Sequence, residues 1–403
     1  MALMPVDAAL SLVLSDLVPL AVETVPVGEA MGRVLAEDLV ARRSQPAADM
    51  SAMDGYAVRA ADIATLPARL PLRGESAAGR PLGAPLAPGT AARIFTGALV
   101  PEGADTVVIQ ENTSRDGDVV VVEVETAPGR NIRRKGFDFA EGAVILKAGQ
   151  RLSARDVMLA AAGNHATLSV RSRPRVAILQ TGDELVRPGE ASGASDVVMS
   201  NVFGLAALAR AAGAEVRDLG KVDDTLEGTR AAIARARAAG FDVLVTSGGA
   251  SVGEHDLMAP ALRAEGIALS VHKIALRPGK PLMYGRGDAM RVLGLPGNPV
   301  SSYVCALLFL TPLLKALQGM SDLETPRRPA RLAAPVKAND IRLDFMRCTS
   351  RKGSDGVPEV TPFPLQDSGN ISALATADCL LVRPAFAPEG AVGDLCEIIP
   401  LAD

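Results

Sequence analysis

The sequence has 403 residues, enough for about two to four domains. Hydrophobic residues make up 48% of it but aromatic residues only 3%, so its cores must be built from Val, Leu, Ile and Ala. The net charge of -4 excludes a surface that attracts nucleic acid as a whole, and any anion site must be a local cluster.

The N-terminal segment "MALMPVDAALSLVL" lacks a basic region and carries Asp7, which indicates an amphipathic helix rather than a signal peptide. The longest apolar run, "YVCALLFLTPLL", is about half the length that spans a bilayer, and it contains Pro312. We therefore expect a soluble, cytoplasmic protein.

The cysteines form no CxxC pair, and the three histidines lie far apart in the sequence. We interpret the cysteines as buried thiols in a reducing cytoplasm, and neither a disulfide nor a zinc site is expected. The residues concerned are Cys305, Cys348, Cys379 and Cys396, with His165, His255 and His272.

The first part of the chain, residues 1–172, is predicted to form an N-terminal region with an inserted β module. Residues 1–50 look helical with short extended breaks. Between 51 and 140, short runs such as "AARIF", "DTVVIQE" and "DVVVVEVET" alternate with Gly and Pro turns, a pattern typical of a small all-β module. Residues 141–172 include "SARDVMLAAAG", a helix that Ser153 can cap.

Residues 173–320 alternate strands and helices, which predicts a mostly parallel sheet covered on both faces. "RVAILQ", "RDLGKV", "FDVLVTS", "PLMYGR" and "RVLGL" are the strands. The helix in "SNVFGLAALARAAGAEV" places apolar residues on one face: Val202, Leu205, Ala206, Ala209 and Ala212. In the next helix, "DTLEGTRAAIARARAAG", Asp224 and Glu227 form a predicted capping box, and Gly240 marks the C-terminal end.

Residues 321–403 return to a β pattern, with "ARLAAPVKA", "DFMRCTS", "PEVTPFP", "CLLVRPA" and "DLCEIIP" as strands. Pro- and Gly-rich turns separate them, which predicts a small β-barrel or sandwich. The segment "MSDLETPRRPA" is the predicted linker from the α/β domain.

Ligands of open α/β sheets bind outside the carboxyl ends of the strands. The loops predicted there are "TGDEL", "DD", "GGASVGEHD" and "PGNP", and all are rich in Gly, hydroxyls or carboxylates. Turns that only reverse the chain direction would not all be rich in Gly, hydroxyl and carboxylate groups.

The loop "SGGASVGEHD" is typical of a phosphate cradle, because the glycines Gly248 and Gly249 let backbone amides approach an anion. Ser247 and Ser251 can donate as well. The loop is not a Walker loop, since no GK[ST] follows, and a Gly-rich turn without a ligand remains the alternative.

Three cations lie close together in the next loop: Lys273, Arg277 and Lys280. They could hold phosphates or an oxyanion, each charge-assisted hydrogen bond contributing roughly 1.5–3 kcal/mol. The alternative is a solvated turn.

The stretch "PGNP" follows a strand and opens a long apolar helix. Pro299 presets φ for the helix, whose first-turn amides would then face the ligand, and Pro296 keeps Leu295 extended. A helix start without a ligand is the alternative.

Several carboxylates lie in these loops and could hold a divalent cation, which prefers hard oxygen ligands: Asp183, Glu184, Asp223, Glu254 and Asp256. Asp224 is better interpreted as a helix cap.

Taken in order, these motifs resemble the MoeA family, which is homologous to the E domain of gephyrin. The resemblance rests on "TGDEL", "SNVFGL", "VTSGGASVGEHD", "KIALRPGKPLMYG" and "GLPGNPVSS". The N-terminal motifs "SAMDGYAVRAAD", "RIFTGALVPEGADTVVIQE" and "NIRRKGFDFAEG" and the C-terminal "DSGNISALATADCLLVRP" extend it over essentially the whole chain.

The resemblance implies an elongated four-part protomer, a homodimer, and an active site between the α/β domain of one chain and the N-terminal domains of the other. It implies a molybdopterin molybdenumtransferase that takes adenylylated molybdopterin and molybdate and releases molybdenum cofactor and AMP. A divalent cation, usually Mg²⁺, accompanies the reaction.

Site residues follow from the resemblance position by position. The implied catalytic residues are Asp54, Thr96, Asp138, Glu184 and Asp256. The implied substrate-binding residues are Arg133, Thr181, Ser247, Gly248, Gly249, Ser251, Lys273, Arg277, Lys280, Pro296, Gly297, Pro299, Ser368 and Ser372. The implied metal ligands are Glu184, Asp223 and Asp256. Arg277 stands where related sequences commonly have Lys, so its fork geometry differs.

Three other functions are compatible with parts of the pattern. Molybdopterin adenylyltransferase uses a similar α/β domain, but the additional N- and C-terminal domains argue against it; that enzyme is instead an expected partner. A gephyrin-like scaffold would bind receptor tails, but the chain has no long linker to a second enzyme domain. A paralogue with a changed metal or substrate is a third reading.

Overall fold

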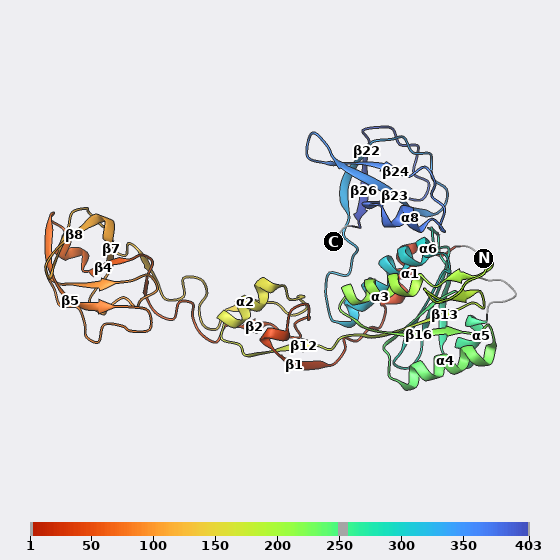
Figure 1. Ribbon diagram of the computed structural model, residues 1–403, viewed down its shortest axis with the longest axis horizontal. Coiled ribbons are helices and arrows are strands. Elements are labelled where there is room, and N and C mark those ends of the chain that lie inside the picture. Colours follow the sequence, from red (N-terminus) through yellow and green to blue (C-terminus); the bar gives the residue numbers. More distant parts are fainter. Residues whose placement is uncertain (1–2, 249–256, 402–403) are drawn as a thin grey trace. The chain divides into compact units, whose positions relative to one another are not determined.

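The computed structural model describes residues 3–248 and 257–401. The chain divides into two compact units (Figure 1). One contains Met1–Glu23, Gly32–Val34 and Arg171–Asp403, and the other contains Thr24–Met31 and Leu35–Val170.

The smaller unit contains a six-stranded β module in the order β7-β4-β6-β5-β9-β8. The strands predicted from "AARIF", "DTVVIQE" and "DVVVVEVET" are confirmed as β6, β7 and β9. Tyr56, Val58, Leu70, Val108 and Val120 are among the buried residues of its core. The strands are β4 (Gly55–Val58), β5 (Ala68–Ser76), β6 (Ala91–Ile94), β7 (Thr106–Ile109), β8 (Thr113–Asp116) and β9 (Val119–Val122).

The rest of this unit is built from short pairings around one helix, α2 (Ala154–Ala162). The predicted cap is confirmed, because Ser153 Oγ accepts from the amide of Asp156 in a capping box. The short strands are β1 (Val22–Pro26) with β12 (Thr167–Arg171), β2 (Leu39–Val40) with β11 (Val144–Leu146), and β3 (Met50–Ser51) with β10 (Ile132–Arg133).

The prediction that residues 1–50 are mainly helical was wrong. Within the described chain, this stretch contains one α-helix, α1 (Val6–Leu14), and one short 3₁₀ turn, Val27–Glu29. The amphipathic character of α1 is confirmed, since Ala9 and Val13 are buried. The β-branched and proline residues of "VETVP" favour extended backbone, and pairing of that segment with β12 overrides any helical tendency.

The larger unit is centred on a six-stranded sheet in the order β16-β13-β17-β21-β20-β18. The first four strands are parallel, and β20 and β18 are antiparallel additions at one edge. The mostly parallel sheet is therefore confirmed. Its strands are β13 (Arg175–Thr181), β16 (Glu215–Val222), β17 (Val243–Ser247), β18 (Ala268–Lys273), β20 (Pro281–Arg286) and β21 (Arg291–Leu295).

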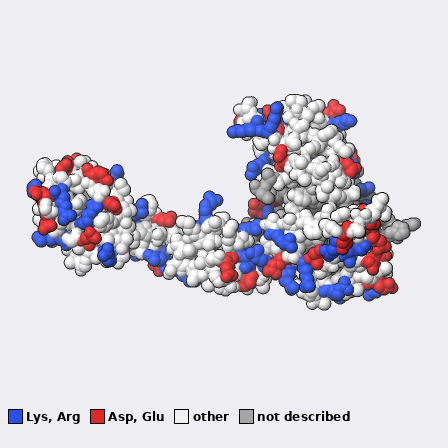
Figure 2. Space-filling model, in the orientation of Figure 1, with Lys and Arg blue, Asp and Glu red and all other residues white. Residues whose placement is uncertain are grey.

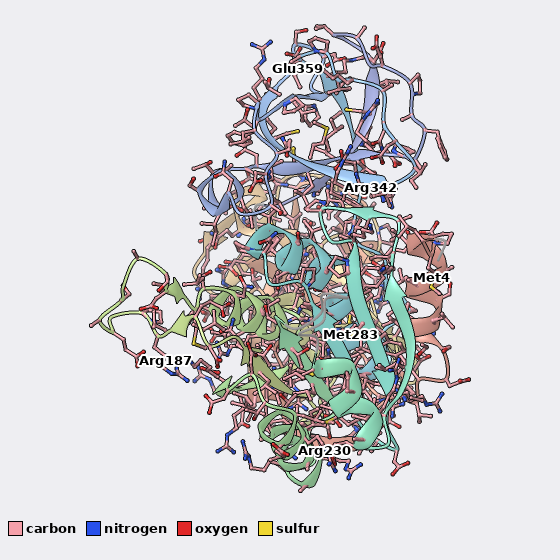
Figure 3. All side chains as sticks on the ribbon, turned by 90° about the vertical axis from the view of Figure 1, so that its right-hand side faces the viewer. Met4, Arg187, Arg230, Met283, Arg342 and Glu359 are labelled. Atoms are coloured by element: carbon pink, nitrogen blue, oxygen red, sulfur yellow. The ribbon has the colours of Figure 1, made fainter. Side chains whose placement is uncertain are left out.

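Helices cover both faces of the sheet (Figures 1 and 3). On one face, α3 (Asn201–Ala211) packs with the long helix that begins at Pro299, and the predicted buried face of α3 is confirmed. On the other face lie α4 (Leu226–Ala238) and α5 (Met258–Ala264). A two-stranded pair, β14 (Leu185–Val186) and β15 (Val197–Val198), lies outside the main sheet.

The cap predicted for α4 was wrong, because Thr225 and not Asp224 is its N-cap. Thr225 Oγ1 accepts a hydrogen bond of 3.1 Å from the amide of Gly228. The amide of Asp224 instead donates to Asp183 Oδ1 at 3.2 Å, so this residue belongs to the loop at the strand end.

The long helix predicted after "PGNP" is confirmed. It continues from α6 (Pro299–Cys305) through a π segment (Ala306–Leu310) into α7 (Thr311–Leu317). Its 19 residues have a mean hydropathy of 1.7, enough by length and composition to cross a membrane, but 72% of it is buried in the fold. Burial of that extent is typical of a core helix.

Residues after 321 form a closed five-stranded barrel, as predicted. The order β23-β24-β22-β26-β25 is closed by pairing of β23 with β25, and the short β19 (Leu276–Arg277) adds to β23. Cys348 and Cys379 face each other across β23 and β25 as free, buried thiols. The elements are β22 (Arg328–Leu332), β23 (Leu343–Lys352), β24 (Pro358–Pro362), α8 (Ile371–Ala375), β25 (Cys379–Arg383) and β26 (Leu395–Pro400).

Candidate active site

The strand register brings most of the predicted loops to one edge of the α/β sheet. Gln180 of β13 pairs with Ser247 of β17, and Ser247 pairs with Leu295 of β21. These strands therefore end together, and the loops beginning at residues 182, 248 and 296 leave from the same edge. The turn between β18 and β20 returns there, because Lys273 pairs with Pro281 in the antiparallel ladder.

The loops after β13 and β17 approach each other closely. Gly248 has φ +93°, and a Cβ there would lie 2.5 Å from the carbonyl oxygen of Thr181. Only glycine fits this position. The Thr181 hydroxyl is buried and makes no hydrogen bond within the described residues, so a hydrogen-bonding group is available for a ligand at this edge.

Asn201 joins two of the loops, although it is not among the site residues predicted from the sequence. Its Nδ2 donates to Ser247 Oγ at 2.8 Å and to the carbonyl oxygen of Gly297 at 2.7 Å. Ser247 Oγ in turn donates to the carbonyl oxygen of Pro296 at 3.4 Å. The only sequence signal was its place in "SNVFGL", since an asparagine that opens a helix is usually interpreted as a cap.

The turn "PGNP" starts helix α6 at Pro299, as predicted. One first-turn amide is already occupied, because Val300 N donates to the carbonyl oxygen of Ser368 at 3.1 Å. Asn298 Nδ2 donates to Ser368 Oγ at 2.9 Å. The prediction that the first-turn amides are bare is therefore wrong for Val300. Ser372 lies nearby in sequence and donates to Asn370 Oδ1 at 3.0 Å.

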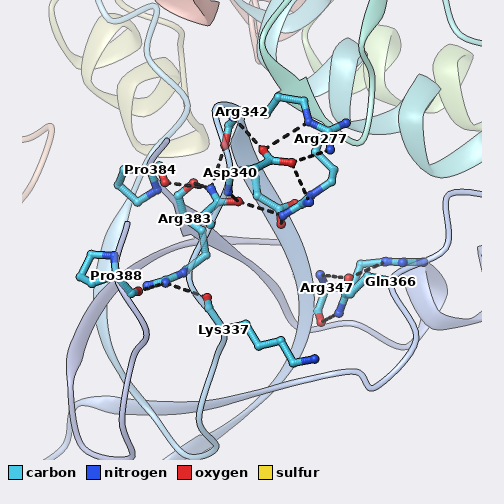
Figure 4. A network of polar contacts seen from close by, with 11 residues as sticks. Arg277, Lys337, Asp340, Arg342, Arg347, Gln366, Arg383, Pro384 and Pro388 are labelled. Atoms are coloured by element: carbon cyan, nitrogen blue, oxygen red, sulfur yellow. Dashed lines mark hydrogen bonds and ion pairs between the residues drawn. The ribbon is translucent and has the colours of Figure 1, made fainter. Parts of the chain in front are cut away.

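The three predicted cations differ in their surroundings. The Arg277 guanidinium is held by Asp344, by Asn339 Oδ1 at 2.8 Å and by Asp340 at 3.3 Å (Figure 4). Its hydrogen-bonding fork is thus directed to the barrel. By contrast, no ion pair involves Lys273 or Lys280 within the described chain, and Lys280 is exposed. These two lysines are the better candidates to meet an anion.

Carboxylates collect at the same edge. Lys221 Nζ donates to the carbonyl oxygens of Asp183 at 3.1 Å and of Leu185 at 3.0 Å, which fastens the first loop to β16. Burial, followed by the charge of Asp183, raises the pKa of Asp224. Glu184 and Asp223 are exposed. Gly249, Ser251, Glu254 and Asp256 lie outside the described residues, so their predicted roles stay predictions.

These carboxylates are hard oxygen ligands of the kind that Mg²⁺ prefers. However, the described residues contain no group of three or more His, Cys, Asp or Glu side chains arranged to hold a metal ion. The described part of the site therefore does not form a metal centre by itself.

The smaller unit holds four of the predicted site residues. Asp54 Oδ1 accepts from the amide of Thr96 at 2.7 Å and from its hydroxyl at 2.8 Å. These bonds, led by the amide, and the nearby Arg93 charge lower the pKa of Asp54. Arg133 is exposed on β10, and Asp138 is exposed in the following loop.

Comparison with protein families matches three models along the chain. Residues 4–163 match the MoeA N-terminal region (domain I and II), residues 177–316 match a probable molybdopterin binding domain, and residues 329–401 match the MoeA C-terminal region (domain IV). The chain belongs to the MoeA family.

Relatives within the MoeA family align with nearly all of the chain. A molybdopterin molybdenumtransferase of Haemophilus influenzae is 34% identical and covers 99% of this chain and 98% of its own length. Molybdopterin molybdenumtransferase 2 of Mycobacterium tuberculosis is 36% identical over 93% of this chain and 94% of its own. The crystal structure of a MoeA protein from Pyrococcus horikoshii superimposes with a TM-score of 0.85 at 30% identity, covering 100% of both chains. The chain is accordingly a transferase of molybdenum cofactor biosynthesis.

One further residue of the MoeA barrel, Arg347, was missed from the sequence. Its side chain is buried, and Nη1 donates to the carbonyl oxygen of Asn370 at 2.9 Å. Its Nε donates to Gln366 Oε1 at 3.3 Å (Figure 4). Burial lowers its pKa. It braces the loop that carries Ser368, and no sequence pattern distinguishes it from the surface arginines.

Proposed function

We propose that the chain inserts molybdate into adenylylated molybdopterin with release of AMP. The observation that carries this proposal is the convergence of Thr181, Ser247, Gly248, Lys273, Lys280 and the 296–299 turn at one sheet edge. Backbone amides, hydroxyls and unpaired ammonium groups suit a substrate with several phosphates, and family membership supports the same reaction.

The residues would divide the work by their chemistry. Lys273 and Lys280 offset the charge of the phosphates and of molybdate, since charge-assisted hydrogen bonds are the strong ones. Asn201 and Gly248 hold the loops in place rather than reacting. The Asp54 carboxylate, kept ionised by Thr96, orients water or a substrate proton. The thiolates that take up molybdenum belong to the substrate.

Family membership also supports a homodimer in the cytoplasm, and a requirement for Mg²⁺ with Glu184, Asp223 and Asp256 as ligands. We include these in the proposal, together with exchange of the adenylylated substrate with molybdopterin adenylyltransferase. Charged side chains of both signs are interspersed on the face shown in Figure 2, which agrees with small anionic substrates better than with nucleic acid.

The test is a single turnover with purified protein, adenylylated molybdopterin, Mg²⁺ and molybdate. AMP release that depends on molybdate, with molybdenum retained, is expected. Asp54→Ala should abolish it, and Asp116→Ala, an exposed aspartate of the same β module, should not. Binding of the adenylylated pterin without AMP release would instead support a scaffold. Formation of that compound from molybdopterin and ATP would support an adenylyltransferase.

A further inference from the structure

Arg93 occupies an unusually constrained position in the β module. Its guanidinium carbon lies 5.1 Å from the ring centre of Tyr56 and 4.7 Å from that of Phe95. Its Nη1 donates to the carbonyl oxygen of Gly55 at 3.2 Å, and its Nη2 donates to Gln110 Oε1 at 2.7 Å. Two rings and two oxygens thus fix one planar cation.

Three of these four contacts adjoin the Asp54–Thr96 pair. Gly55 follows Asp54, and Phe95 precedes Thr96. Gln110 is adjacent in space, because its backbone N–H donates to the carbonyl oxygen of Asp54 at 3.1 Å. Arg93 therefore holds the backbone on both sides of the hydrogen bonds that Asp54 receives from Thr96.

The local backbone leaves little room for another arrangement. A Cβ at residue 55 would lie 1.9 Å from the carbonyl oxygen of Val108, so Gly55 is packed directly on β7. Gly55 also pairs with Ile94 of β6, and Tyr56 pairs with Arg93 itself. With β4 fixed between β6 and β7, the guanidinium is the side-chain group that joins β4, the end of β6 and the 3₁₀ turn at Gln110.

We propose that Arg93 is a positioning residue for the Asp54–Thr96 pair. It orients the Asp54 carboxylate without touching substrate. The value of this role for turnover rests on the proposed function, in which Asp54 takes part in the transfer. The geometric part of the proposal concerns the β module alone and is open to measurement without any substrate.

A purely structural brace and a positioning residue predict different results. A brace would lower the melting temperature of the β module and leave the Asp54–Thr96 hydrogen bonds as they are. A positioning residue changes those bonds in a protein that is still folded. If only the charge of Arg93 matters, Arg93→Lys should behave like the parent, because Lys keeps the charge and loses the planar fork.

The experiment compares Arg93→Gln and Arg93→Lys in the full chain, with Arg69→Gln as the matched control. Arg69 is an exposed arginine of the same module that pairs with Asp116. The pKa of Asp54 is measured by NMR on protein labelled with ¹³C-aspartate, assigned through Asp54→Asn, together with the amide proton shift of Thr96. Both Arg93 variants should raise the Asp54 pKa and move the Thr96 amide upfield, and the control should change neither.

Turnover provides the second readout. The Arg93 variants should lose kcat by up to about a hundredfold with little change in KM, because a carboxylate displaced by about 1 Å reacts poorly. An unchanged Asp54 pKa and Thr96 shift in folded Arg93→Gln would overturn the proposal, as would an Arg93→Lys variant identical to the parent. Should Arg93→Gln fail to fold, Phe95→Leu tests the same contact. Full activity of Asp54→Asn would remove Asp54 from the proposed function and leave the NMR result standing.

Discussion

Asn298 and Ser368 are 70 residues apart in the chain, yet Asn298 Nδ2 donates to Ser368 Oγ at 2.9 Å. The bond joins the turn at the edge of the α/β sheet to the loop of the C-terminal barrel. The backbone makes the same connection, from Val300 N to the carbonyl oxygen of Ser368 at 3.1 Å. Both predicted motifs, "PGNP" and "DSGNIS", therefore act as one structural unit.

Ser368→Ala removes the side-chain bond and keeps the backbone bond. We expect the free energy of unfolding to fall by only about 1 kcal/mol, while AMP release slows because the 296–299 turn loses one of its fixed points. Denaturant unfolding and single-turnover assays measure the two effects. Ser350→Ala, an exposed serine on β23, is the control. An unchanged rate of AMP release in folded Ser368→Ala would contradict this interpretation.

Asn201→Asp replaces the amide donor by a carboxylate of the same shape. Two hydrogen bonds are lost, and an anion faces the carbonyl oxygen of Gly297, so the free energy of unfolding should fall by about 1–3 kcal/mol. Hydrogen exchange should accelerate at the backbone amides of Gly297 and Asn298, since Pro296 and Pro299 carry no amide hydrogen. Ser247→Ala removes only one of the two bonds and should give roughly half the effect. Equal hydrogen exchange in the parent, Asn201→Asp and Ser247→Ala would show that Asn201 does not hold the turn.

The Arg277–Asp344 pair is predicted to attach the barrel to the α/β domain. The Asp344 side chain is only 11% exposed, whereas that of Arg277 is 40% exposed, so we expect Arg277→Gln to cost about 1–2 kcal/mol. Arg351→Gln breaks an exposed pair with Glu359 on the barrel and should cost less than about 0.5 kcal/mol. A double-mutant cycle with Asp344→Asn measures the coupling. Similar losses for the two arginines would argue against the attachment.

Thr181→Val tests whether a ligand uses the buried hydroxyl. Because Thr181 Oγ1 has no partner within the described residues, its removal should leave stability unchanged within about 0.5 kcal/mol. Affinity for the adenylylated substrate should fall about tenfold, which corresponds to about 1.4 kcal/mol. Thr246→Val removes a similar buried hydroxyl from the interior of β17 and should leave affinity unchanged. Isothermal titration calorimetry separates the two variants, and equal affinities would exclude the hydroxyl as a ligand.

Cys305 and Cys396 should resist modification in the native protein. Burial raises the pKa of Cys396 to about 11 and raises that of Cys305 as well. A raised pKa keeps the thiol protonated and unreactive at pH 8, and Cys396 should react only as the pH approaches 11. A disulfide reagent at pH 8 should leave Cys305 and Cys396 unlabelled in native protein and label all four cysteines in guanidinium chloride. Rapid labelling of Cys305 or Cys396 in native protein at pH 8 would contradict the assigned burial.

The residue pattern predicted the elements that depend on local sequence. Alternating apolar runs indicated the strands of the sheet and the barrel, and the buried face of α3 follows from its helical spacing. The capping box of α2 was also predictable, because Ser153 and Asp156 are only three residues apart. Local reasoning failed where two neighbours compete, as with Asp224 and Thr225, since the outcome depended on the distant carboxylate of Asp183.

For the candidate site, the sequence by itself determined which loops carry Gly, hydroxyl and charged groups, and that parallel strands deliver them to one edge. Only the tertiary structure decided what each group contacts. Arg277 and Lys280 are equivalent cations in "RPGK", but Arg277 is directed to Asp344, 67 residues away. Asn201 and Arg93 could not be selected from the sequence, because their partners are brought to them by strand register and helix packing.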